Sequence, residues 1–204
     1  MSLSLRSGNL PYSPGSLPTD QQARRTAREF AELVGRVVNA TVSECPVGFV
    51  DLAEGPELGF VAHCPDRIPA PMRLKNGRYL FLYQRLGLRH EERYLTTVEY
   101  QYTYQETPDP EGWIFRYEYQ REPPAGYQYP RAHLHINADP GSYPGNKPFP
   151  KLHIPTGRVT IEAVVRHLLD EHSIPCISPH WQDVLAETEA DFAAIQRRRV
   201  DGNT

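Results

Sequence analysis

The chain has 204 residues, of which 39% are hydrophobic and 23% are charged, and its formal net charge is −3. This length allows one domain with a sizeable core, and the mild charge gives no overall attraction to nucleic acid or to membranes. No apolar run approaches the roughly 18 residues of a transmembrane helix, and residues 1–18, rich in Ser, Pro and Gly, lack the apolar centre of a signal peptide. We therefore expect a cytoplasmic location and no membrane partner.

The cysteines and the domain organisation give further expectations. Cys45, Cys64 and Cys176 are odd in number and widely spaced, which argues against a disulfide framework and against a CxxC zinc site. Residues 1–18 are predicted to be a disordered tail and residues 19–204 a single domain. Within it, residues 19–90 form either an N-terminal subdomain or one edge of a sheet that residues 91–200 complete.

The first predicted element is a helix that begins at residues 18–20 and ends near Asn39. Its small and apolar residues recur at helical spacing, and they are Ala23, Ala27, Phe30, Ala31, Val34, Val37 and Val38. Short β-like runs follow at residues 41–52, 58–63 and 79–86.

Residues 94–119 have the alternation of two half-buried strands. From Tyr94 to Tyr104 the even positions are mainly aromatic or β-branched, and from Trp113 to Tyr119 every odd position is aromatic. Turn-forming residues at 108–112 predict that the two strands form an antiparallel hairpin. Residues 131–137 then predict a third strand of this meander, and residues 151–154 a short fourth.

Two helices are predicted to close the chain. Thr160 has the side chain of a helix N-cap and precedes an apolar stripe, and Ser178-Pro179 is a favoured start for the last helix. This order predicts an α+β fold in which an antiparallel meander carries the N-terminal helix and the two C-terminal helices on one face.

The strand of residues 131–137 concentrates the polar chemistry of the chain. Alternation places Arg131, His133, His135 and Asn137 on one face. A histidine pair can act as general base and general acid in one turnover, and an arginine beside it can hold a phosphate. We take His133, His135 and Arg131 as candidate catalytic residues and Asn137 as a substrate-binding residue.

The neighbouring hairpin offers further substrate contacts. Arg116 could meet phosphate, and Tyr117 and Tyr119 could stack bases if they lie on the histidine face. The same aromatic row could equally be the core face of the sheet.

His153 opens an alternative in which His133, His135 and His153 together bind a metal ion such as zinc, which commonly takes three protein ligands and a water molecule. No HExxH motif or cysteine pair supports this alternative. The simpler interpretation is that His153 lies at a strand end with ordinary hydrogen bonds.

Residues 96–172 resemble the TumE-like toxins of bacterial toxin–antitoxin systems. The resemblance rests on the aromatic strand of residues 114–119, the Pro-x-x-His-x-His segment of residues 130–135 and the short connection to a Thr-capped helix at Thr160. It implies an antitoxin partner and an RNA-directed activity that His133 and His135 carry, with Arg131 binding phosphate.

Three functions follow as hypotheses. The first is a toxin-like, metal-independent ribonuclease or phosphoryl-transfer protein that acts through the His-x-His strand without a cofactor. The second is a metal-dependent enzyme with the three-histidine site. The third is a non-catalytic module that binds a protein partner.

Overall fold

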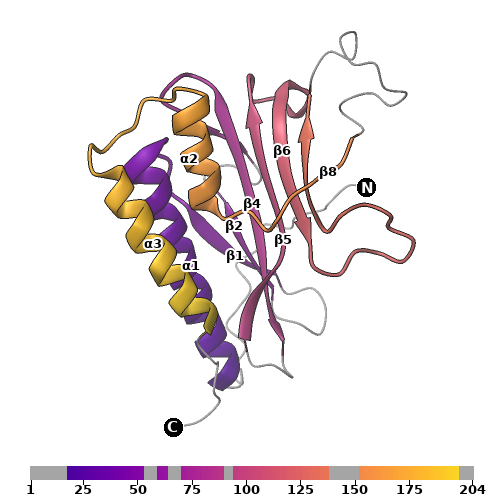
Figure 1. The fold of residues 1–204 in the computed structure, drawn as a ribbon. Helices are drawn as coiled ribbons and strands as arrows, with labels where there is room; N and C mark the ends of the chain where they lie inside the picture. The colour runs from indigo at the N-terminus through magenta and orange to yellow at the C-terminus, as the bar shows by residue number, and fades with distance from the viewer. Residues whose placement is uncertain (1–17, 53–58, 64–69, 90–93, 138–151, 198–204) are drawn as a thin grey trace.

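One face of an antiparallel sheet carries the three α-helices of the described chain, and a short 3-10 helix (Pro110–Gly112) lies in the connection between two of the strands (Figure 1). This is a computed structural model, and it describes residues 18–52, 59–63, 70–89, 94–137 and 152–197. The predicted α+β class, with an antiparallel meander and three helices on one side, is confirmed. The predicted tail lies outside the described residues, except for Pro18.

The described strands form one eight-stranded sheet in which every pairing is antiparallel. In chain order they are β1 (Gly48–Leu52), β2 (Gly59–His63), β3 (Met72–Arg73), β4 (Tyr79–Arg89), β5 (Tyr94–Gln105), β6 (Trp113–Gln120), β7 (Ala132–Ile136) and β8 (Ile154–Pro155). The spatial order is β1-β2-β4-β5-β6-β7-β8, and β3 pairs with the first residues of β4. The strands before residue 90 thus join the same sheet as those after it.

The three helices are α1 (Pro18–Thr41), α2 (Ile161–Glu171) and α3 (Trp181–Arg197). All seven apolar residues that define the predicted stripe of α1 are buried. At the start of α2 the Thr160 hydroxyl accepts a hydrogen bond from the amide of Ala163 at 3.2 Å, as an N-cap should. The rings of Phe30 and Phe192 lie 4.9 Å apart and join α1 to α3.

The sheet face under the helices is aromatic. Tyr100, Tyr102 and Tyr104 of β5 are at most 2% exposed, and Tyr100 stacks on Tyr102 and on Tyr119. The tyrosine row is therefore the core face of the sheet, which was one of its two interpretations.

Two irregularities interrupt the predicted alternation. The β4–β5 register shifts between Arg85 and Leu86. As a result, the odd-numbered residues Leu95 and Thr97 are buried at the start of β5, whereas strict alternation would bury the even-numbered residues throughout the strand. The β5–β6 register shifts after Tyr104, and Trp113 contacts Arg116 and His135 rather than continuing the Phe115 row. Bulges of this kind insert one residue and reverse the faces beyond it.

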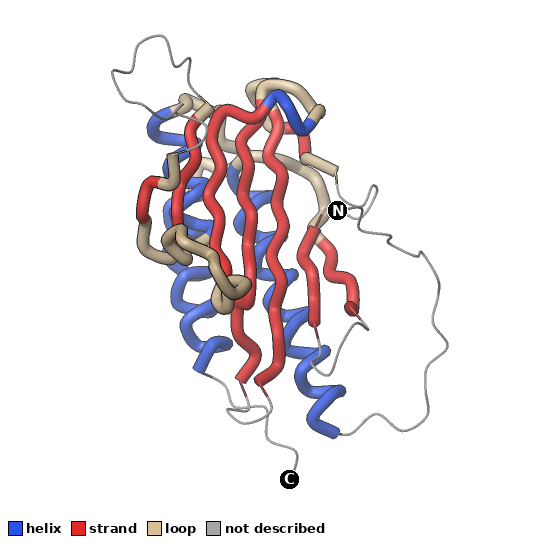
Figure 2. Tube along the Cα trace, turned by 90° about the vertical axis from the view of Figure 1, so that its right-hand side faces the viewer, coloured by secondary structure: helices blue, strands red, loops and turns tan. Residues whose placement is uncertain are grey.

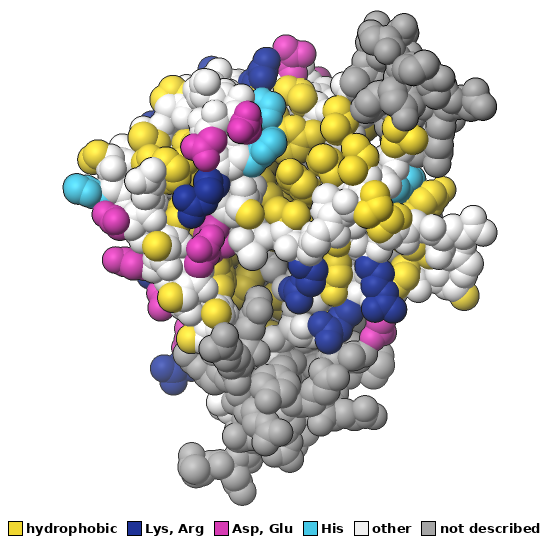
Figure 3. Space-filling view, viewed as in Figure 1, with side chains coloured by type: hydrophobic (Ala, Val, Ile, Leu, Met, Phe, Trp, Pro, Cys, Tyr) yellow, Lys and Arg dark blue, Asp and Glu magenta, His cyan; other side chains and the backbone are white. Residues whose placement is uncertain are grey.

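The helices leave the β6–β8 edge of the core face partly open. Tyr117 and Leu134 are only partly buried there, and hydrophobic side chains are visible at the surface beside α2 (Figure 3). No helix of the described chain is long and apolar enough to cross a lipid bilayer.

One cysteine takes part in a disulfide, which the number and spacing of the cysteines did not predict. Cys45 is disulfide-bonded, whereas Cys176 is free and exposed. Cysteine number and spacing alone do not show which thiols the fold brings together.

Candidate functional site: a histidine cluster on the open sheet face

The candidate site lies on the sheet face away from the helices. The connection between β6 and β7 projects on that side (Figure 1), and Figure 2 views the strands from it. In the β6–β7 ladder His135 lies opposite Arg116 and His133 opposite Glu118. Paired residues share a face, so these four side chains stand together and the core-facing Tyr117 and Leu134 point the other way.

The next strand adds a third histidine. β8 pairs Pro155 with His133, and His153 lies two residues before Pro155, on the same face by alternation. The ring centroids of His133 and His153 are 4.8 Å apart, those of His135 and His153 4.4 Å, and those of His133 and His135 4.8 Å. The three imidazoles form a nearly equilateral triangle.

The triangle is sheltered although it lies on the helix-free face. His133 is 1% exposed and His135 5% exposed. The cover comes from the loop before β7, where the ring of Tyr129 stacks on His153 at 3.6 Å with an interplanar angle of 10°. Tyr129 itself is 45% exposed, so a single ring separates His153 from solvent on that side.

The orientation of His133 is fixed by the same loop. Its Nδ1 lies 2.7 Å from the carbonyl oxygen of Pro130, which can only accept a hydrogen bond, so Nδ1 carries the proton. Its Nε2 is directed into the cluster, 3.2 Å from a carboxylate oxygen of Glu118. Metal-binding histidines typically have this second interaction with a carbonyl or carboxylate.

Glu118 completes the cluster. One carboxylate oxygen lies 3.2 Å from Nε2 of His133 and 3.5 Å from Nε2 of His135, and the other lies 2.6 Å from Nε of Arg116. Burial acts to raise the pKa of this carboxyl, but its contacts with His133 and His135 and the charge of Arg116 outweigh burial and hold the pKa well below the ordinary range. The cluster therefore contains a fixed negative charge.

The cluster has the composition of a transition-metal site. One nitrogen from each of His133, His135 and His153 can be chosen so that all three lie within 4.8 Å of one another. Nitrogens bound to one tetrahedral Zn²⁺ at about 2.0–2.1 Å lie roughly 3.3 Å apart, so the rings would have to close by about 1.5 Å. Nδ1 of His135 and Nε2 of His133 are buried and meet no strict hydrogen-bond geometry within the described residues. Nε2 of His133 lies 3.2 Å from Glu118, so a metal ion bound there would replace that contact.

The other predicted site residues are divided between the two faces. Arg116 joins the cluster through Glu118, whereas Tyr117 and Tyr119 lie on the opposite, helix-facing side. Arg131 is exposed and makes no contact with the histidines that the structure describes. Asn137 is exposed and donates from its side chain to the carbonyl of Trp113 at 2.8 Å, so it closes the end of the β6–β7 ladder.

Sequence reasoning assigned Glu118 a pairing with Arg116 or with cross-strand neighbours and gave it no place in the site. A glutamate between aromatic strand residues looks like ordinary solvent-facing alternation. Only the β6–β7 register, which sequence does not give, places it opposite His133.

No family model, curated protein or solved structure matches the chain. The fold and the site together describe an antiparallel α+β protein with three histidines and a glutamate clustered on its helix-free face.

Proposed function

We propose that this protein is metal-dependent, with His133, His135 and His153 binding one divalent first-row transition metal such as Zn²⁺. The observation that carries the proposal is the convergence of three imidazoles from β7 and the segment entering β8 upon one point beside a carboxylate. Three histidines suit zinc, iron, nickel or copper better than magnesium or calcium, which prefer oxygen ligands.

Hydrolysis is the reaction class that this arrangement supports best. A metal held by three protein ligands lowers the pKa of a bound water molecule towards neutrality. Glu118, ionised and 3.2 Å from Nε2 of His133, would accept a hydrogen bond from such a water molecule and hold it in position. Its side chain is 26% exposed, which gives a substrate access to the cluster from the Glu118 side.

The metal-independent alternative has less support. It requires His133 and His135 to exchange protons with a substrate directly, yet both rings are almost completely buried and His133 Nδ1 is held by Pro130. The RNA-directed activity and the antitoxin partner remain predictions from the TumE-like resemblance. A phosphodiester would be a suitable substrate for the metal-dependent mechanism, with the exposed Arg131 as a phosphate contact.

Metal content is the direct test. Protein purified without chelator and measured by inductively coupled plasma mass spectrometry should contain about one transition-metal ion per chain. His135→Ala should lose it, because two imidazoles and a carboxylate bind far more weakly. The matched control is His180→Ala, since His180 is exposed at the start of α3. Metal-free wild type that also fails to bind added Zn²⁺ or Co²⁺ would overturn the proposal.

A further inference from the structure

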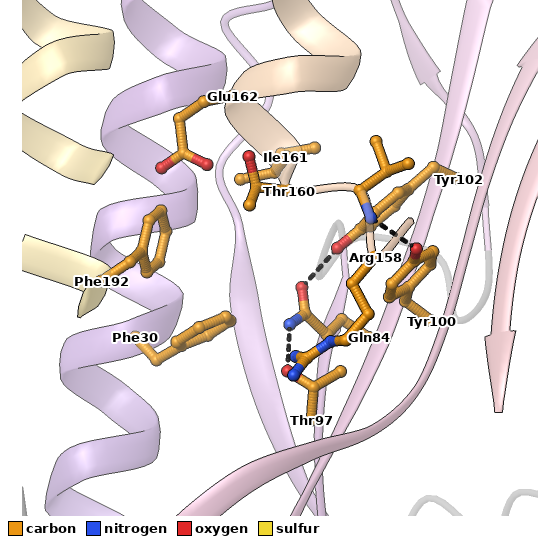
Figure 4. Close-up of a pocket in the computed structure, with 11 residues that line it drawn as sticks. Phe30, Gln84, Thr97, Tyr100, Tyr102, Arg158, Thr160, Ile161, Glu162 and Phe192 are labelled. Atoms are coloured by element: carbon orange, nitrogen blue, oxygen red, sulfur yellow. Dashed lines mark hydrogen bonds between the residues drawn. The ribbon is translucent and has the colours of Figure 1, made fainter. Parts of the chain in front are cut away.

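A second polar site lies on the other face of the sheet, between the helices and β4–β5. A cavity of about 240 Å³ is found there (Figure 4). Its walls are Phe30, Gln84, Thr97, Tyr100, Tyr102, Arg158, Val159, Thr160, Ile161, Glu162 and Phe192. An apolar cavity of about 150 Å³ already accommodates benzene, so this one has room for a ring with a short substituent.

The unusual wall residue is Glu162 in the first turn of α2. Its side chain is completely buried, and both carboxylate oxygens make no hydrogen bond within the described chain. Its own backbone amide and the hydroxyls of Thr160 and Thr188 act to lower its pKa, but burial outweighs them, and Thr188 donates its hydroxyl to the carbonyl of Val184 at 2.9 Å. Leaving such a group unsatisfied costs about 1–3 kcal/mol, so its burial calls for an explanation.

The rest of the cavity is already paired. The Tyr102 hydroxyl donates to Oε1 of Gln84 at 2.6 Å, and Nε2 of Gln84 donates to the Thr97 hydroxyl at 3.0 Å. The Tyr100 hydroxyl accepts from the amide of Val159 at 2.8 Å. These bonds, drawn in Figure 4, leave Glu162 as the wall residue whose acceptors await a partner.

The surroundings of Glu162 favour a cation. Figure 4 places its carboxylate next to Phe192, with Phe30 close by, and Arg158 on the other side of the cavity. Aromatic faces attract organic cations, and an ammonium group offers the N–H donors that the carboxylate lacks. Arg158 and Thr160 are exposed, so the cavity reaches solvent there, and solvent screens the charge of Arg158.

We propose that this cavity binds a small organic amine of about one ring in size, whose ammonium group pairs with Glu162 and whose apolar part packs against Phe30 and Phe192. Burial raises the pKa of Glu162 because it disfavours the charged carboxylate, and an ammonium group in the cavity would favour that charged form. This binding is separate from the histidine cluster, because the two sites lie on opposite faces of the sheet.

The test compares three probes of nearly equal shape by isothermal titration calorimetry on the full chain: 2-phenylethylamine, 2-phenylethanol and 3-phenylpropionate. The amine should bind wild type at least tenfold more tightly than the alcohol, and the anion should not bind. Glu162→Gln, which keeps the size of the side chain, should abolish the preference for the amine. Glu111→Gln, which changes an exposed carboxylate between β5 and β6, should retain it.

Three outcomes would overturn the proposal. Equal binding of amine and alcohol would show that the cavity recognises only the apolar part of the ligand. Amine binding that survives Glu162→Gln would place the ligand elsewhere. No binding of any probe, with a cooperative unfolding transition in both proteins, would mean that the cavity holds only water.

Discussion

Glu118 is the residue on which the proposed chemistry depends most. It lies beside His133 and His135 but contributes a charge rather than an imidazole, so its contribution to catalysis can be separated from its contribution to metal binding. Glu118→Gln keeps the side-chain size and removes the negative charge. We expect the variant to keep its metal and to lose about 100-fold in turnover of bis(p-nitrophenyl) phosphate or a p-nitrophenyl ester, because the attacking water molecule would no longer be held in position.

The matched control for this measurement is Glu111→Gln, which changes an exposed carboxylate in the β5–β6 connection. If Glu118→Gln loses metal together with activity, Glu118 is a fourth ligand. If it loses neither, Glu118 does not position the attacking water molecule.

Glu162 predicts a pH dependence of stability. Its pKa is raised in the folded chain, primarily by burial, so the folded state retains a proton that the unfolded chain releases as pH rises through the ordinary carboxyl range. The free energy of unfolding must therefore fall as pH rises from the unfolded pKa to the raised folded pKa, by about 1.4 kcal/mol for each pH unit that separates the two values. Above the folded pKa this contribution is constant.

Urea unfolding between pH 4 and pH 8 can isolate this effect. Glu162→Gln cannot ionise, so its stability relative to wild type should improve as pH rises through that window. A constant difference between the two proteins would show that Glu162 titrates normally. Glu111→Gln again supplies the control for a lost surface charge.

At the scale of elements, the loop before β7 acts as a cover for the cluster. The Tyr129 ring stacks on His153, and the Pro130 carbonyl orients His133. Removal of the ring by Tyr129→Ala should open a path to solvent and increase the rate of metal dissociation roughly tenfold, which corresponds to about 1.4 kcal/mol of lost stacking and shielding. Tyr129→Phe should behave as wild type.

The rate can be followed by transfer of Co²⁺ or Zn²⁺ to excess chelator in stopped flow. An unchanged rate in Tyr129→Ala would mean that the loop does not control access. Because the side chain is 45% exposed, the substitution should leave the unfolding transition nearly unchanged.

Elements with strong local signals could be predicted from the sequence. The α1 stripe, the Thr160 cap and the β5–β6 hairpin all follow from spacing that neighbouring residues set. The bulges could not be predicted in this way, because a shift of one residue is decided by packing across the sheet. Trp113 therefore lies beside His135, although its sequence position suggests the face of Phe115.

The site could be predicted only in part for the same reason. His133 and His135 share a face through alternation along one strand, which is a local property. The approach of Glu118 and His153 depends on the β6–β7 and β7–β8 registers, which are long-range properties. To decide whether Tyr117 lies with the histidines, one must know which face of β6 continues the histidine face of β7. The structure places Tyr117 on the opposite face.

At the scale of the whole molecule, the two faces of the sheet differ in what stabilises them. The helix side is held by a large apolar core. At the edge of the sheet, β8 has only two residues, and it pairs with β7 through Pro155 and Ile154. A metal bound by His133 and His135 of β7 and by His153 just before β8 would fasten this edge of the sheet.

Metal binding should therefore stabilise the whole fold. A ligand that binds only the folded state adds about 4 kcal/mol when its free concentration is 1,000 times Kd, so Zn²⁺ should raise the Tm of chelator-treated protein in a concentration-dependent way. His153→Ala should remove this increase while its metal-free Tm stays close to that of metal-free wild type, because His153 is only partly buried. Differential scanning calorimetry with and without Zn²⁺ measures both quantities. A Tm that saturating Zn²⁺ leaves unchanged in wild type, or raises equally in His153→Ala, would show that His153 does not contribute to a metal site in the folded protein.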